Sequence, residues 1–508
     1  MFSKKIIKKT EDLKKKIAQL RQKKIKIVHC HGVYDLFHAG HVAYLEEAKK
    51  YGDILFVTLT EDKFVKKGPG RPYFKSGDRA KVISSLSCVD YVFVNHAYDA
   101  VNLIKLIKPD FYIKGPDYKN SKEDITNKIQ IEKSITKKYG GKIVFTTKET
   151  FSSSKIINKS DLVFNSSQKK YLKKLGKKNL DKYLDIILKK LSNKRILLIG
   201  EAIIDNYNFC EGMGKSGKES VLIVRDLYEN KYIGGVLSMA NYLAEFCKEV
   251  HIVSYIGRKK EYLNFINKNL NKKIKFDYII KKDSGTIIKK RFYDLRDRKK
   301  LFGSYLVNDT ALDKLSEKIL LKKITKSKSK KDAIIVADFG HGLISLKTAR
   351  FISKQKNFFG LNAQVNSSTV GYNNISKYLK PKCLVINATE LRQELKERDG
   401  DLNFLARKLK KIIKAKYLVV TMGRAGAMMI DENNKTILCP AFATDVVDKI
   451  GAGDTLFAYL NLFLLAGCDK ELSLFIASIA AAETTNTYAN SSILNKINLK
   501  KSVHYLLK

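Results

Sequence analysis

The chain has 508 residues, which is too long for one ordinary hydrophobic core and predicts about three domains or two larger ones. Hydrophobic residues make up 44% of the sequence, a normal globular content that supplies full-sized cores. The 97 Lys and Arg residues against 51 Asp and Glu residues give a formal net charge of +46, which suits either phosphorylated substrates or a polyanion.

The apolar and cysteine patterns indicate a soluble protein of the cytoplasm. Residues 1–24 form a basic segment without a continuous apolar stretch, unlike a signal peptide. The longest apolar runs, 459–468 and 474–482, are separated from each other by Asp469, Lys470 and Glu471 and are too short to span a bilayer. The seven cysteines contain no Cys-x-x-Cys pair, so we expect reduced thiols rather than a zinc ribbon or a disulfide framework.

Short β-like runs alternate with helical stretches over residues 25–158. Strict alternation predicts an α/β domain with a parallel, doubly wound sheet that binds ligands at the carboxyl ends of its strands. The runs, rich in β-branched and aromatic residues, are 25–30, 53–60, 89–95, 111–115 and 142–147.

Residues 159–194 carry Leu and Ile at helical spacing among many lysines and predict a helical linker. The β/α alternation restarts at 195 and continues to 495, which predicts a second doubly wound domain. Within it, 219–235 and 286–307 alternate apolar and polar residues, as half-exposed antiparallel strands do. We expect these two segments to form a small β lid or a dimerisation sheet.

The stretch HGVYDLFHAGH, residues 31–41, joins a predicted strand to a predicted helix. His38 and His41 would then lie at a helix N-terminus, where backbone N–H groups favour phosphate and Gly40 permits its close approach. Two imidazole donors there could stabilise the pentavalent phosphorus of a nucleotidyl transfer.

Two other interpretations of these histidines stay open at this stage. With His29 and His31 nearby, a metal cluster is conceivable, although no carboxylate stands at a clear ligand spacing. The histidines could also serve packing alone.

Further cationic and hydroxyl residues fall at the same predicted sheet edge. Together they would form a triphosphate pocket. They are Lys67 and Arg71 in KKGPGRP, Arg79 in GDRAK, Lys114, Gly115 and Asp117 in IKGPDY, and Ser153 and Ser154 in FSSSKII.

The stretch VVDKIGAGDTLFA, residues 446–458, places a Gly-Ala-Gly turn before an apolar helix. The backbone N–H groups of Gly451, Ala452 and Gly453 could form an anion hole for a transferring phosphoryl group, with Asp454 as the base for an acceptor hydroxyl. The alternative is a helix N-cap with no catalytic role.

Other motifs in this half support the catalytic interpretation. Asp205, Gly234 and Gly235 suit a sugar; Asn387 and Glu390 suit hydrated Mg²⁺; and Thr421, Gly423 and Gly426 suit a nucleotide. Around 286–307, the residues Lys289, Lys290, Arg291 and Arg296 could grip a distal phosphate or form a solvated charge run.

Residues 25–158 resemble the cytidylyltransferase-like nucleotidyltransferase family, most closely the adenylyltransferase half of bacterial ADP-heptose synthesis proteins. The resemblance implies a Rossmann-like HxGH domain and nucleotide contacts, with His38, His41 and Lys114 as catalytic residues. Its G-x-F-D-x-x-H-x-G-H pattern is matched by Gly32, Tyr34, Asp35, His38, Gly40 and His41, while His31 and Pro116 depart from it.

Residues from 195 onward resemble the ribokinase-like (PfkB) carbohydrate kinases, and DFGHG at 338–342 resembles a turn of the heptose-kinase branch. The resemblance implies that Asp454 is the base. Ser238 stands in the sugar-binding region where the family usually carries Asn, which puts the sugar selectivity in doubt.

The two resemblances together imply a bifunctional sugar-activating enzyme of surface-glycan synthesis, with its domains in the opposite order to the heptose proteins. We expect Mg²⁺, ATP, a second nucleotide that is ATP or CTP, and small-molecule partners, with no specific nucleic acid and no membrane insertion. A homodimer through the kinase domain stays open. The alternatives are a CTP-dependent enzyme of a polyol phosphate, or a polyanion-binding protein with relic motifs.

Overall fold

The computed structural model describes residues 2–118, 128–147, 156, 158, 162–176, 180–365, 373–444, 446–489, 491 and 493–507. The chain divides into two compact units. The N-terminal unit consists of residues 1–176 and 497–508, and the second unit of residues 177–496. In sequence, the second unit is therefore inserted into the first.

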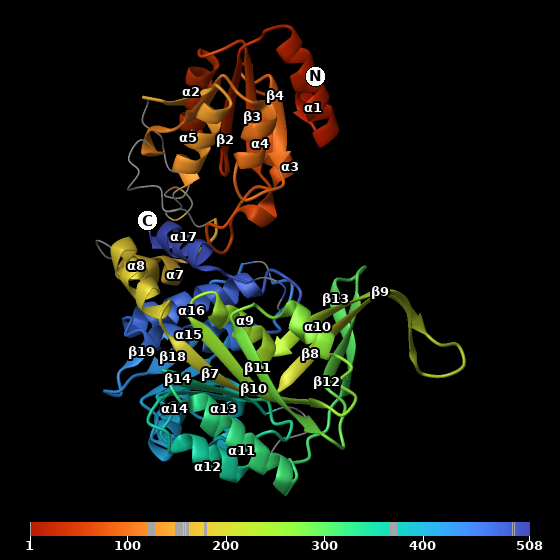
Figure 1. Cartoon of the computed structure of the whole chain (residues 1–508), viewed down its shortest axis with the longest axis vertical. Helices are drawn as coiled ribbons and strands as arrows, with labels where there is room; N and C mark the ends of the chain where they lie inside the picture. The colour runs from red at the N-terminus through yellow and green to blue at the C-terminus, as the bar shows by residue number, and fades with distance from the viewer. Residues whose placement is uncertain are drawn as a thin grey trace. The chain divides into compact units, whose positions relative to one another are not determined.

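The N-terminal unit contains the expected doubly wound sheet, drawn in red to orange in Figure 1. Its six strands are all parallel, in the order β1-β4-β3-β2-β5-β6. The order reverses at β2, and in such sheets ligands bind at the carboxyl ends beside that point. The strands are β1 Ile6–Ile7, β2 Ile27–Gly32, β3 Ile54–Thr60, β4 Tyr91–Asn95, β5 Phe111–Lys114 and β6 Lys142–Phe145.

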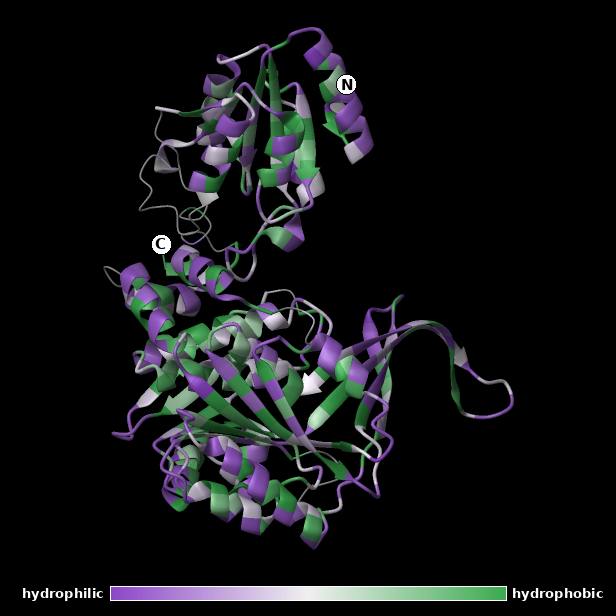
Figure 2. Cartoon of the chain, in the orientation of Figure 1, coloured by the Kyte–Doolittle hydropathy of each residue, from purple (hydrophilic) through white to green (hydrophobic). Residues whose placement is uncertain are grey.

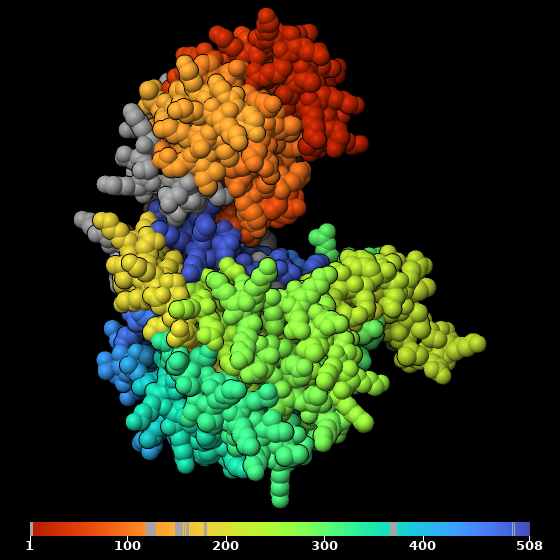
Figure 3. Space-filling view, in the orientation of Figure 1, coloured from red at the N-terminus to blue at the C-terminus, as the bar shows by residue number. Residues whose placement is uncertain are grey.

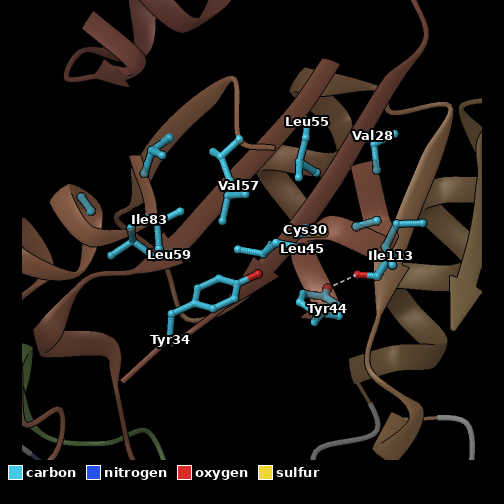
Figure 4. Close-up of a cluster of buried hydrophobic side chains, with 14 residues drawn as sticks. Val28, Cys30, Tyr34, Tyr44, Leu45, Leu55, Val57, Leu59, Ile83 and Ile113 are labelled. Carbon is cyan, nitrogen blue, oxygen red and sulfur yellow. Dashed lines mark hydrogen bonds between the residues drawn. The ribbon is translucent and has the colours of Figure 1, made fainter. Parts of the chain in front are cut away.

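Two apolar clusters hold helices against this sheet. One joins the sheet to α2 and α3 and contains Tyr44, whose hydroxyl donates to the Ile113 carbonyl at 2.7 Å (Figure 4). The other joins it to α1 and α4. The helices of the unit are α1 Thr10–Gln22, α2 Ala39–Lys49, α3 Ser76–Ser84, α4 Val101–Ile107, α5 Lys128–Lys138, α7 Ser166–Leu175 and, from its second residue on, α17 Lys496–Leu507.

Residues 1–24, expected to be no more than a basic segment, are part of this fold. Strand β1 pairs with β4, and helix α1 buries Leu13, Ile17 and Leu20 against the sheet. The buried residues are three or four positions apart and so form one helix face. Lysines on the other faces hid this short apolar stripe in the sequence, and Figure 2 shows both kinds of residue on α1.

The second unit is built on a nine-stranded sheet in the order β11-β10-β7-β14-β15-β16-β17-β18-β19. Its strands are parallel except at β18 and β19, which pair antiparallel. They are β7 Arg195–Gly200, β10 Glu249–Gly257, β11 Ile274–Lys281, β14 Ala333–Asp338, β15 Phe358–Ala363, β16 Cys383–Asn387, β17 Tyr417–Thr421, β18 Ala427–Ile430 and β19 Thr436–Cys439.

The two alternating segments form a second, four-stranded sheet in the order β13-β12-β8-β9. Strand β8, which the sequence analysis missed, is buried along its first nine residues and therefore shows no alternation. The far ends of β8 and β9 extend from the body of the unit as an arm (Figures 1 and 3). The strands are β8 Ala202–Lys215, β9 Leu222–Gly235, β12 Ile287–Asp294 and β13 Lys299–Leu306.

The segment expected as a helical linker holds two helices, α7 in the N-terminal unit and α8 in the second. No helix in the described ranges is long and apolar enough to cross a bilayer. The helices of the second unit are α8 Leu180–Leu191, α9 Val236–Ala244, α10 Leu263–Asn269, α11 Lys314–Lys328, α12 Leu346–Ser353, α13 Ala388–Leu395, α14 Leu402–Ile413, α15 Ala452–Leu465 and α16 Lys470–Thr484.

The packing of α1 gives a stability prediction. Leu13 is fully buried, so Leu13→Ala should lower the free energy of unfolding of the N-terminal unit by about 2 to 4 kcal/mol, from lost burial and the cavity left behind. Lys14→Ala, exposed on the same helix, is the matched control and should stay within about 0.5 kcal/mol. Urea unfolding followed by circular dichroism measures both, and equal stability of the two variants would contradict the assignment of α1 to the core.

Candidate active sites

The first candidate site is a cavity of about 170 Å³ at the carboxyl ends of β2, β3 and β5. These ends meet beside the point where the strand order reverses, as expected for a ligand site in such a sheet. The polar residues that line it are His31, Thr60, Lys66, Lys67, Tyr98, Asp99, Lys114, Tyr118, Glu132, Lys501 and Tyr505, and Gly32 also contributes.

His38 and His41 stand at the start of α2, as the N-cap residue and the third helical residue. Their rings stack with centroids 3.9 Å apart, and the His38 N–H donates to Nδ1 of His41 at 3.3 Å. Burial, together with charge repulsion from His38 and Lys67, lowers the pKa of His41 to about 3. At neutral pH the ring is therefore uncharged, and because Nδ1 accepts a bond its proton lies on Nε2, which can donate. Neither histidine is among the described residues that line the cavity.

His29 and His31 are held by threonine hydroxyls rather than arranged around a metal. Thr58 Oγ1 lies 2.8 Å from His29 Nε2 and 2.8 Å from His31 Nδ1. His29 is fully buried, whereas His31 lines the cavity. Among the residues that the structure describes, no three or more His, Cys, Asp or Glu side chains are placed to hold a metal ion.

Lys114 lies at the cavity wall at the end of β5. Its ammonium pairs with the Glu132 carboxylate at 3.0 Å, and both side chains are largely buried. The rings of Tyr112 and Tyr118 lie 5.0 and 5.1 Å from the same Nζ. These contacts fix the ammonium at the strand end, where it can face a bound anion.

Two residues predicted to bind phosphate serve the protein's own loops instead. The Asp35 carboxylate accepts the backbone N–H groups of Tyr73 and Phe74 at 2.9 and 3.1 Å. The buried Arg79 guanidinium donates to the carbonyls of residues 33, 60 and 74 and pairs with Asp62. The phosphate role expected for Arg79 is thus not supported, because its donors are engaged inside the fold.

The remaining predicted residues of this half lie around the same sheet edge. Tyr34 is buried and Gly40 lies in the first turn of α2. Arg71 is held by Asn158 at 2.9 Å and lies 3.9 Å from Asp35. Gly115 follows β5. Asp117 lies in a short 3₁₀ turn with its side chain outside the description, and Ser153 and Ser154 lie outside the described residues.

The second candidate site is a cavity of about 250 Å³ in the second unit. It brings together residues from β8, the end of β9, β12 and the first turn of α15. The lining residues are Ile203, Asp205, Gly235, Lys289, Arg291, Phe339, Gln364, Ile450, Gly451, Gly453 and Asp454.

The glycines of this site are required by close contacts. A Cβ on Gly234 would lie 2.1 Å from Oδ2 of Asp205, and Gly235 has a φ of +55° with Glu201 O 2.5 Å from its Cβ position. Only glycine therefore lets β9 run this close to the Asp205 carboxylate. Gly451 caps α15 with a φ of +83°, which leaves the first-turn N–H groups of Gly453 and Asp454 without carbonyl partners inside the helix.

Asp454 lies in the wall of the cavity, where Gln364 Nε2 donates to its Oδ1 at 2.9 Å. Burial raises the pKa of Asp454 to about 7. Lys289 and the Gln364 bond oppose this rise, whereas the negative charges of Asp205 and Glu390 add to it. A carboxylate with a pKa near neutrality suits proton removal from an alcohol at physiological pH.

Two cations accompany the carboxylates. Arg291 pairs with Asp205 at 2.5 Å, and both side chains are more than nine-tenths buried. Lys289 also lines the cavity, so the 286–307 segment is more than a solvated charge run. Lys290 belongs to the other face of β12 by strand alternation and lies over Phe292, while Arg296 is exposed beyond the strand.

Asn387 and Glu390 form a capping box at the start of α13. Asn387 Oδ1 accepts the Glu390 N–H at 2.8 Å, and Glu390 Oε2 accepts the Asn387 N–H at 3.0 Å. Burial raises the pKa of Glu390. Since each Glu390 oxygen accepts one backbone bond, including one from Val365 at 3.4 Å, both keep a lone pair for a further ligand such as water on Mg²⁺.

The other predicted residues of this half do not line the described cavity. The Ser238 hydroxyl donates to the Gly235 carbonyl at 2.9 Å and is buried. Thr421 ends β17. Gly423 and Gly426 form the turn after it, and a Cβ on Gly426 would lie 2.1 Å from Cys439 O.

Sequence reasoning missed Gln364 and Glu201. Glu201 is fully buried and accepts the N–H groups of Phe339 at 2.9 Å and His341 at 3.1 Å, so it holds the DFGHG turn that places Phe339 at the cavity. Burial, together with the nearby Asp338 charge, raises the pKa of Glu201 to about 7. A lone Glu between two apolar runs at 196–204 is the signal that could have revealed it.

These two sites define an enzyme with a carbohydrate kinase domain and a nucleotidyltransferase domain. Residues 193–496 match the family model described as pfkB family carbohydrate kinase, and residues 29–159 match the one described as cytidylyltransferase-like. The chain therefore belongs to the pfkB family of carbohydrate kinases.

Among curated proteins, the chain is similar to the bifunctional protein HldE of Aliarcobacter butzleri, with 41% identity over 134 residues, and of Helicobacter pylori strain G27, with 46% over 110 residues. These matches cover 25% and 21% of this chain and 28% and 24% of those proteins. The chain thus matches about a quarter of the length of these relatives, in its N-terminal part.

Among solved structures, phosphofructokinase-2 from Escherichia coli in complex with potassium aligns with a TM-score of 0.51 at 15% identity, covering 62% of this chain and 100% of that one. The same enzyme in complex with fructose-6-phosphate aligns with a TM-score of 0.50 at 16% identity, with the same two coverages. At these identities the likeness concerns the fold.

The charge balance around Asp454 gives a pH prediction. If Asp454 is the base, kcat/KM of the kinase reaction rises with pH through about 7 as the carboxyl loses its proton. Lys289→Met removes the positive charge that lowers the pKa of Asp454, so the midpoint should move to higher pH by about 1 unit.

Lys290→Met, on the other face of β12, is the matched control and should leave the midpoint in place. Both profiles are measured from ADP release between pH 5.5 and 9. Equal midpoints in the two variants would contradict the coupling of Lys289 to Asp454.

Proposed function

We propose that this protein activates a sugar in two reactions, each in its own unit. The second unit phosphorylates a sugar phosphate with ATP, with heptose 7-phosphate phosphorylated at C1 as our favoured substrate. The N-terminal unit joins a sugar 1-phosphate to a nucleotide, preferably from ATP, and releases pyrophosphate. The observation that carries the proposal is the meeting of Asp205, Gly235, Lys289 and Asp454 in one cavity.

In the kinase reaction, a sugar hydroxyl attacks the γ-phosphorus of ATP and ADP leaves. We propose that Asp454 accepts the hydroxyl proton, since its pKa of about 7 matches that task. The first-turn N–H groups of α15 then face the oxygens of the transferring phosphoryl group. Asp205 orients a sugar hydroxyl, and Lys289 attracts the phosphate that the sugar already carries.

In the transferase reaction, a phosphate oxygen of the sugar 1-phosphate attacks the α-phosphorus of the nucleotide, and pyrophosphate leaves. Lys67 and Lys114 attract the phosphates, and the Nε2–H of His41 donates to oxygens on which negative charge grows. His38 would act beside it at the same helix N-terminus.

We propose Mg²⁺ as the cofactor of the kinase reaction, bound through water by Asn387 and Glu390. The fit rests on the lone pairs left on the Glu390 carboxylate and on its electrostatic effect at Asp454. When bound, Mg²⁺ would neutralise negative charge on the phosphate groups of ATP. Few protein side chains are then needed around the metal, because water and phosphate oxygens would supply most of its ligands.

Heptose is favoured by the similarity of the N-terminal part to the HldE proteins, and Lys289 in the kinase cavity suits a sugar that already carries a phosphate. We also propose that the order of the two domains, with the nucleotidyltransferase before the kinase, is the reverse of that in the HldE proteins. CTP with a polyol phosphate is the second candidate, favoured by the cytidylyltransferase-like match. Because the reaction uses nucleoside triphosphates, we propose that it takes place in the cytoplasm and that it leads to a surface glycan such as lipopolysaccharide.

The two active sites should fail independently. Asp454→Asn should lower ADP release by roughly 10²- to 10⁴-fold and leave pyrophosphate release unchanged, because the sites lie in separate units. His41→Ala should lower pyrophosphate release by roughly two to three orders of magnitude and leave ADP release unchanged. In each variant, the activity that is retained shows that the chain is folded. Parallel loss of both activities in either variant would refute the division of labour.

The substrates are tested by measuring pyrophosphate release from ATP or CTP with heptose 1-phosphate, other sugar 1-phosphates and polyol phosphates. We expect the highest kcat/KM with ATP and a heptose 1-phosphate. A clear preference for CTP with a polyol phosphate would establish the second candidate instead.

We also propose that two copies associate through β9, which exposes Leu222, Ile223, Leu227 and Tyr228 on the arm. Exposed apolar side chains on a sheet are typical of protein contact surfaces. Leu227→Asp should convert a dimer to a monomer in sedimentation velocity, whereas Leu438→Asp, exposed elsewhere in the unit, should not. A monomeric wild-type protein would contradict this proposal.

A further inference from the structure

Helix α17 lies next to the nucleotidyltransferase cavity although it follows the kinase domain in sequence. Residues 497–508 belong to the N-terminal unit, and neither family match includes them, since the kinase match ends at residue 496. Lys501 and Tyr505 of this helix line the cavity together with Lys67 and Lys114. They are four residues apart and so share one helix face.

Contacts with the loop 66–72 hold α17 in this place. Lys67 Nζ lies 4.8 Å from the centre of the Tyr505 ring, within reach of a cation–π contact. A Cβ on Gly68, whose φ is +98°, would lie 3.0 Å from the Leu506 side chain. Glycine at position 68 therefore suits both the left-handed backbone and the close approach of the loop to the helix.

A chain of polar contacts joins the same helix to the HxGH segment. Asn158 Nδ2 donates to the Tyr505 carbonyl at 2.7 Å, and its Oδ1 accepts from Arg71 at 2.9 Å. Arg71 in turn lies 3.9 Å from Asp35. Helix α17 is thus connected to two of the segments that surround the proposed nucleotide site.

The charge of the cavity points to an anion as its ligand. Four lysines line it, Lys66, Lys67, Lys114 and Lys501, against the two carboxylates of Asp99 and Glu132, and Glu132 is paired with Lys114. An excess of ammonium groups in a concave site attracts phosphate. Lys501 contributes one of these charges from a helix outside the nucleotidyltransferase family match.

We propose that α17 completes the transferase site, with Lys501 binding a phosphate group of the nucleoside triphosphate or of the sugar 1-phosphate and Tyr505 holding Lys67 in place. This inference rests on the proposed transferase function. Lys501 is a binding residue, and Tyr505 is a positioning residue that acts through Lys67. The kinase reaction, in the other unit, does not depend on either.

The test compares Lys501→Ala and Tyr505→Ala with Lys500→Ala in the full chain, with pyrophosphate release as the assay. Removing a charged contact to phosphate should raise KM about tenfold, while kcat changes less. The substrate whose KM rises, triphosphate or sugar 1-phosphate, identifies the phosphate that Lys501 holds. Lys500→Ala, which is not among the described lining residues, should keep the wild-type KM.

Folding is checked by thermal unfolding and by ADP release, which should equal that of the wild type in all three variants. Unchanged KM values in Lys501→Ala, or an equal rise in Lys500→Ala, would overturn the role of α17 while the transferase activity itself stands. If the wild-type protein released no pyrophosphate with any substrate pair, the proposed function itself would fail. Lys501→Ala decides the question even if Tyr505→Ala does not fold.

Discussion

Close approach of glycine backbone to a neighbouring segment shapes both proposed sites. At Gly234 a Cβ would fall 2.1 Å from the Asp205 carboxylate, and at Gly68 it would fall 3.0 Å from Leu506. Without a side chain, β9 can lie against Asp205, and the loop after β3 can lie against α17. In each cavity, a glycine without a functional side chain therefore lets the charged groups come close together.

The two cavities arrange charged groups for a phosphate ligand in different ways. Both candidate cavities lie beside carboxyl strand ends, and the kinase cavity also includes the first turn of α15, where backbone N–H groups favour phosphate. The N-terminal unit lines its cavity with four lysines beside the strand ends. The kinase unit instead withdraws Asp454 from water among Asp205, Lys289 and Glu390, so that the pKa of one carboxyl is set near neutrality by burial and by opposing charges.

Some of the many positively charged side chains of the protein line the two cavities. Lys289 and Arg291 lie among carboxylates, and four lysines face the N-terminal cavity. Other lysines support structure, as Lys5 does by donating to the Leu86 carbonyl at 2.8 Å and Lys300 by pairing with Asp448. The net charge of the chain does not predict the role of any one lysine, because that role depends on the groups within a few ångströms of its ammonium.

The sequence by itself determined the two α/β folds, because alternating buried strands and amphipathic helices favour mainly parallel sheets with helices covering both faces. It also indicated the Gly-rich turns and the carboxylate at position 454, since motif spacing fixes local geometry. It could not indicate that Arg79 donates its hydrogen bonds to backbone carbonyls inside the fold. Nor could it indicate that Glu201 and Gln364 support the kinase cavity, or that α17 belongs to the N-terminal unit. Those facts depend on contacts between residues far apart in the chain, up to 438 positions between Lys67 and Tyr505, and only the folded chain decides which distant side chains meet.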